Sequence, residues 1–113
     1  MQSKNLPEEY PKEISARQAA GKKSKGAFIL DVRELNEFLQ ERIQGAVLIP
    51  LGQLRYRLNE LPKDKEIVVV CRSSDRSPVG LDILRKAGYK KSSCMTGGIN
   101  AWKAAGFPTV TGH

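Results

Sequence analysis

Short apolar runs alternate along this chain with segments of helical periodicity. Three of them, FILDV (28–32), GAVLIP (45–50) and EIVVVC (66–71), are rich in β-branched residues and apolar at successive positions. This pattern is typical of parallel strands that are buried on both faces. Weaker runs predict two further strands, over residues 92–96 and 13–15. We therefore expect a central parallel sheet of about four to five strands.

Helices are predicted between these strands from leucine spacing, capping residues and stop signals. They are expected over segments after Ser15 and after Arg33, over 51–61, from Ser77 to Gly88, and over 99–105. Ser77 is expected to cap the fourth helix, with Pro78 at the first helical position. The order predicts a single α/β domain over residues 1–113, with helices on both faces of the sheet and a loosely ordered segment over residues 1–12.

The composition argues against several classes of protein. A chain of 113 residues, 40% of them hydrophobic, can bury a core without metal ions or disulfides. Two cysteines, Cys71 and Cys94, are too few for a disulfide scaffold or a cysteine-rich zinc site, and the one histidine is His113. We expect no metal and no cofactor. The sequence has no apolar run of membrane-spanning length and no signal peptide, so we expect a cytoplasmic protein without a membrane partner.

The net charge of +7 is unevenly distributed. Through Asp82 there are 14 basic and 12 acidic residues, whereas from Arg85 onward there are 5 basic residues and no acidic one. A nucleic-acid-binding surface would show Lys and Arg interleaved with aromatic residues. The basic stretches KKSKG (22–26) and YKK (89–91) are short, so we interpret them as solvated surface and expect no nucleic-acid partner. A small anionic substrate is compatible with this charge.

Cys71 stands at the carboxyl end of a predicted central strand, where parallel α/β sheets bind their ligands. A cysteine reacts as its thiolate, which a helix amino terminus and nearby cations stabilise. The helix predicted from Ser77 directs its amide end toward this loop, and Arg72 and Arg76 lie within it. Backbone N–H groups of a loop of this kind can form an anion-binding nest around the sulfur. The pattern favours a reactive Cys71, whereas Cys94 is interpreted as buried packing.

Four segments in succession resemble the signatures of single-domain rhodaneses, which are sulfurtransferases that carry sulfur as a cysteine persulfide. They are LDVRELNEF (30–38), IQGAVLIPL (43–51), CRSSDRS (71–77) and TGGINAWKAAGFP (96–108). The last two are the more specific. The chain departs from the family pattern at Arg42 and Gln44, where a histidine and a proline are usual, and at Ser74, which is often glycine.

The resemblance implies a small rhodanese-like domain in which Cys71 takes the outer sulfur of thiosulfate or of a persulfide donor. Cys71 would then pass this sulfur to cyanide or to a thiol, and the thiol can belong to a partner protein. The loop residues Arg72, Ser73, Ser74, Asp75 and Arg76 are then expected to bind the substrate. In this reading the two arginines hold the donor's sulfonate and the loop amides hold the persulfide.

Three further residues are expected to support this site. Asp31 and Arg33 lie at a neighbouring strand end, where they either brace the loop or form a structural ion pair. Ser77 offers a hydroxyl, although helix capping is the simpler role for it.

The cysteine loop also bears on three alternatives to a sulfurtransferase. A cysteine-dependent phosphatase has five residues between its cysteine and its arginine, and a histidine before the cysteine. This chain has only four residues between Cys71 and Arg76, and Val70 stands before the cysteine. An arsenate reductase would be expected to have further redox cysteines. A non-enzymatic persulfide carrier or binding module would use the same residues as an enzyme, so the sequence does not separate the two.

Overall fold

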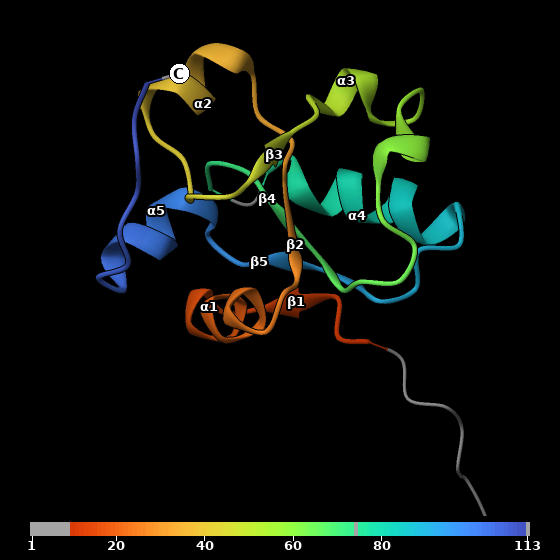
Figure 1. The fold of residues 1–113 in the computed structure, drawn as a ribbon, viewed down its shortest axis with the longest axis horizontal. Coiled ribbons are helices and arrows are strands. Elements are labelled where there is room, and N and C mark those ends of the chain that lie inside the picture. Colours follow the sequence, from red (N-terminus) through yellow and green to blue (C-terminus); the bar gives the residue numbers. More distant parts are fainter. Residues whose placement is uncertain (1–9, 74, 113) are drawn as a thin grey trace, which may run out of the picture.

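The computed structural model describes residues 10–73 and 75–112, which form an α/β fold around a five-stranded parallel sheet (Figure 1). The strand order is β1-β5-β4-β2-β3. The strands are β1 (Glu13–Ile14), β2 (Phe28–Asp31), β3 (Val47–Leu48), β4 (Ile67–Val70) and β5 (Ser92–Met95). The predicted parallel α/β architecture is confirmed. Residues 1–9 of the segment that we expected to be loosely ordered lie outside the described residues.

Helices cover both faces of the sheet, as Figure 1 shows. They are α1 (Ala16–Ser24), α2 (Leu35–Gln40), α3 (Leu51–Leu54), the 3₁₀ helix η1 (Leu58–Glu60), α4 (Ser77–Lys86) and α5 (Gly98–Ala104). The helix expected over 51–61 is interrupted between α3 and η1. At this break Arg57 leaves the helical region of φ and ψ, and its side chain bonds both Gln53 and Glu60.

Successive residues of β4 supply two separate cores. Ile67, Val69 and Cys71 belong to an apolar cluster with α3 and α4, whereas Val68 and Val70 belong to a cluster with α1 and α5. This alternation follows from the period of two along a strand and explains why every residue of β4 is apolar. In the described part of the chain, no helix is both long and apolar enough to span a membrane.

Candidate active site

Cys71 directly follows the central strand β4 and is fully buried. Two backbone hydrogen bonds from the start of α5 hold the loop at this point. The N–H of Ile99 donates to the Cys71 carbonyl at 2.9 Å, and that of Asn100 donates to the Arg72 carbonyl at 3.1 Å. Because α5 anchors these carbonyls, the backbone that carries the thiol is fixed from a segment distant in sequence.

Gly98 allows this close approach. Its φ is +58°, and a Cβ atom built on it would lie 2.5 Å from the carbonyl carbon of Arg72. No side chain fits at that distance, and the left-handed φ is itself unfavourable for other residues. Gly98 therefore packs directly against the backbone of the cysteine loop.

Ser77 contacts the sulfur. Its Oγ lies 3.3 Å from the Cys71 Sγ, and both side chains are fully buried. The prediction that Ser77 caps α4 is wrong: Arg76 is the N-cap and Ser77 is the first residue of the helix. The helix begins one residue earlier than the Ser-Pro pair suggested, so the hydroxyl turns into the site. When Cys71 is a thiolate, this hydroxyl can donate to it.

Cys94 lies in the same apolar cluster and is also buried. Burial raises the pKa of its thiol, an effect that the nearby Ser77 hydroxyl partly opposes. Its Sγ also lies 3.2 Å from the Lys12 carbonyl oxygen, to which the thiol donates. A neutral thiol of this kind fits the interpretation of Cys94 as packing.

Arg76 is engaged by a carboxylate that the sequence did not indicate. Its two terminal nitrogens donate to the oxygens of Glu37 at 2.7 and 2.9 Å. The guanidinium that we expected to hold the donor's sulfonate therefore ties the loop to α2. Asp75 is largely exposed, with Oδ1 3.8 Å from the Arg76 Nε. Glu37 lies 39 positions from Arg76, and no local sequence signal connects them.

Arg72 and Ser73 are exposed, and Ser74 lies outside the described residues. Among residues 10–73 and 75–112, no carboxylate lies within ion-pair distance of Arg72. Arg72 is therefore the exposed cation adjacent to the cysteine. It can attract an anion without first giving up an ion-pair partner within this part of the chain.

Asp31 and Arg33 form a buried ion pair. The Arg33 guanidinium donates to the Asp31 carboxylate at 2.7 to 3.1 Å, and the Arg33 backbone N–H adds a bond of 3.0 Å. The same guanidinium donates to the Glu41 carbonyl after α2 at 2.8 Å. These contacts correspond to a structural ion pair and not to a brace on the cysteine loop. Through Asp31 and the Glu41 carbonyl, Arg33 connects the two ends of the segment that contains α2 and Glu37.

Arg42, which replaces the usual histidine, connects α2 to the C-terminal segment. Its guanidinium donates to the carbonyls of Phe38 at 3.2 Å and Gly112 at 2.5 Å, and it stacks over the Phe38 ring. Figure 1 shows the segment that ends at residue 112 running up to α2, where the Gly112 N–H donates to the Leu39 carbonyl at 2.8 Å. This departure from the family pattern thus affects packing around α2.

Replacing Glu37 by glutamine is expected to remove a pH-dependent part of the stability. The Arg76 guanidinium lowers the pKa of Glu37 from 4.5 to about 2, so the charged carboxylate stabilises the fold above about pH 4.5 and the contribution disappears as the pH falls toward 2. With both side chains partly exposed, we expect a loss of about 1–2 kcal/mol at pH 7. Urea unfolding at pH 7 and pH 3 measures it.

The matched control is Glu60→Gln, which breaks the exposed pair of Glu60 with Arg57. Its effect on unfolding should be smaller at both pH values, because solvent screens an exposed pair. Equal losses in the two variants at pH 7 would show that the Glu37 contact does not hold the loop.

Comparison with known proteins agrees with this geometry. The model of the Rhodanese-like domain family matches residues 10–105. A sulfurtransferase of Allochromatium vinosum is 35% identical over 82 residues, covering 73% of this chain and 77% of that protein. YrkF of Bacillus subtilis, named as a candidate sulfur carrier, is 40% identical over 74 residues, covering 66% of this chain and 40% of that protein. The crystal structure of a Pseudomonas aeruginosa thiosulfate sulfurtransferase superposes with a TM-score of 0.82 at 27% identity, covering 92% of this chain and 21% of the other.

Proposed function

Because the chain belongs to the rhodanese-like domain family, we propose that it transfers sulfane sulfur through a persulfide on Cys71, with thiosulfate as a donor. The family and its relatives named sulfurtransferases support a sulfurtransferase. The observation that carries the proposal for this site is the buried Cys71 thiol at the end of β4, with the Ser77 hydroxyl 3.3 Å from it at the start of α4. Together they form a nucleophile beside a donor that can stabilise negative sulfur.

The reaction proceeds in two steps. The Cys71 thiolate attacks the outer sulfur of thiosulfate, the original sulfur–sulfur bond breaks, and sulfite leaves with its electron pair. A persulfide anion then remains on Cys71. An acceptor thiolate or cyanide attacks the outer sulfur, so that an acceptor persulfide or thiocyanate forms and the Cys71 thiolate returns. No general base is required when the attacking thiol is already ionised, so the absence of an internal histidine does not impede the chemistry.

The arginines take different roles in this proposal. Arg72 is exposed and draws the dianionic donor to the loop. Arg76 is held by Glu37, so it maintains the shape of the loop while its charge adds to the positive potential at the sulfur. In this proposal Arg76 positions the loop and Arg72 attracts the donor, whereas the sequence alone gave both arginines the same role.

Replacing Arg72 by alanine is expected to raise the KM for thiosulfate about three- to tenfold with little change in kcat, because an exposed cation contributes mainly to attraction of the donor. Added salt should have a similar effect on the unmodified protein. Arg72→Lys should recover part of the loss, since the charge returns without the planar fork. Lys25→Ala, at the end of α1, is the control. Unchanged kinetics for Arg72→Ala would remove this residue from the donor site.

Intact mass spectrometry after treatment with thiosulfate tests the function itself. The protein should gain one sulfur atom at Cys71 and lose it when cyanide is added. It should hydrolyse an aryl phosphate no faster than its Cys71→Ser variant, because four residues between Cys71 and Arg76 make a loop too small to surround a phosphoryl group with three oxygens. Cys71-dependent phosphatase activity, or no gain of sulfur from thiosulfate, would overturn the assignment.

A persulfide carrier is the second candidate, and the candidate sulfur carrier among the relatives favours it. A carrier would gain sulfur at Cys71 from a protein donor and turn over small donors and acceptors poorly. The rate of thiocyanate formation from thiosulfate and cyanide therefore separates the two.

A further inference from the structure

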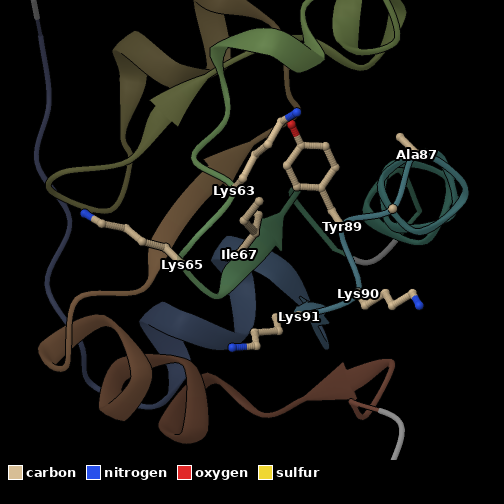
Figure 2. A pocket seen from close by; sticks show the side chains of 8 residues that line it. Lys63, Lys65, Ile67, Ala87, Tyr89, Lys90 and Lys91 are labelled. Atoms are coloured by element: carbon tan, nitrogen blue, oxygen red, sulfur yellow. The ribbon is translucent and has the colours of Figure 1, made fainter.

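A cavity of about 330 Å³ opens at the other end of β4 from Cys71. Its lining consists of Gly88 and of the seven residues labelled in Figure 2: Lys63, Lys65, Ile67, Ala87, Tyr89, Lys90 and Lys91. Ile67 begins β4 and Cys71 follows its end, so the two sites are separated by about 13 Å of extended chain. This cavity is independent of the cysteine loop.

Backbone contacts hold the two segments that form the cavity. One segment precedes β4 and the other joins α4 to β5. The Ile67 N–H donates to the Lys91 carbonyl at 2.9 Å, which joins the segments directly. The Tyr89 hydroxyl donates to the Leu58 carbonyl at 2.9 Å and so fixes the ring as a wall. The cavity therefore has an apolar lining whose accessible surface comes from the Tyr89 ring, because Ile67 is almost fully buried.

Four exposed lysines surround this apolar lining, and we refer to Lys63, Lys65, Lys90 and Lys91 as the lysine ring. Within the described part of the chain, none of them forms an ion pair. Asp64 lies in the same loop, but its single charge leaves the ring strongly positive, and Glu66 is paired with Lys22 at 2.8 Å. The ring thus presents cations whose charge the neighbouring carboxylates do not balance.

The directions of these lysines indicate the kind of ligand. In Figure 2 the amino groups of Lys65 and Lys90 point to opposite sides of the cavity. A single phosphate would need donors that converge on one point. Cations spread around an apolar centre instead fit an extended anionic chain with an apolar group at its middle. Among the described residues, Tyr89 is the one aromatic residue that lines the cavity, which disfavours single-stranded nucleic acid, since that ligand favours successive stacking rings.

We propose that the lysine ring docks an acidic segment of a protein partner. An apolar side chain of the partner enters the cavity against the Tyr89 ring, and carboxylates on both sides of it meet the four lysines. Because the ring and Cys71 lie at opposite ends of β4, a partner bound here leaves the cysteine loop open to a sulfur donor or acceptor. The surface is an anchoring site, and its binding does not depend on the reaction at Cys71.

A fluorescein-labelled peptide with one leucine between two groups of glutamates is the probe. Fluorescence anisotropy should show saturable binding at low salt that weakens as salt is added. The variant K63Q/K65Q/K90Q/K91Q should bind about tenfold more weakly. A variant of equal charge, K12Q/R17Q/K23Q/K25Q, should lose about twofold or less. Sulfur transfer from thiosulfate should remain unchanged in both variants, which separates this proposal from the function of Cys71.

Two further probes complete the test. A peptide with glycine in place of leucine should bind about three- to tenfold more weakly, since the apolar lining then remains unfilled. An oligothymidylate of the same charge should bind more weakly than the leucine peptide. The proposal is overturned if the leucine peptide does not bind, if both charge variants lose affinity equally, if glycine replaces leucine without effect, or if the oligonucleotide binds more tightly through the lysine ring.

Discussion

Replacing Cys71 by serine is expected to reduce thiosulfate-dependent sulfur transfer to the level without protein, because a serine hydroxyl does not form a persulfide. Cys94→Ser should retain most of the activity. The two thiols belong to the same buried cluster, but Cys71 follows β4 at the cysteine loop, whereas Cys94 lies within β5 and burial raises the pKa of its thiol. Initial rates of thiocyanate formation measure both variants.

Circular dichroism and thermal unfolding serve as the controls in this comparison. Serine is close to cysteine in size, so both variants should fold. If the folded Cys94 variant loses all activity while the Cys71 variant keeps it, the reactive sulfur has been assigned to the wrong strand.

Replacing Gly98 by alanine is expected to lower the free energy of unfolding by about 2–4 kcal/mol. The new Cβ would overlap the backbone of Cys71 and Arg72, and alanine is strained at a φ of +58°. The folded fraction should also transfer sulfur about 10- to 100-fold more slowly, because the carbonyls anchored by Ile99 and Asn100 move away with the loop. Urea unfolding and initial rates measure the two effects.

Gly21→Ala is the matched control for this substitution. Gly21 lies inside α1, and nothing within 4 Å would meet its new Cβ. Alanine should raise stability by about 0.5–1 kcal/mol there through helix propensity. If Gly98→Ala is as stable and as active as this control, α5 does not constrain the loop in the way the distances indicate.

The sheet and the position of the cysteine could be predicted from the sequence because both depend on local pattern. A short run of β-branched residues such as 67–70 favours a buried strand, and the residue after a central parallel strand lies at the ligand-binding edge. The family signatures at 71–77 and 96–108 have the same local character.

The partners of the loop could not be predicted, because they depend on contacts between distant segments. Nothing in ELNEF marks Glu37 as the partner of Arg76, and the glycine pair at 97 and 98 does not reveal which backbone it approaches. Ser77 was misassigned for a different reason. A serine before a proline usually caps a helix, but α4 starts one residue earlier, at Ser77. This shift of one position places the Ser77 hydroxyl beside the Cys71 sulfur instead of at a backbone N–H of the helix.

The way α2 is held has a consequence for how easily this segment opens. No residue of this helix is buried, and ion pairs and backbone contacts from Arg33, Arg42 and Arg76 hold it in place. A segment with little apolar burial opens at a lower free energy than the sheet beneath it. Because Arg76 of the cysteine loop is paired with Glu37 of α2, we expect an opening of α2 to release this end of the loop while the apolar clusters on β4 stay folded.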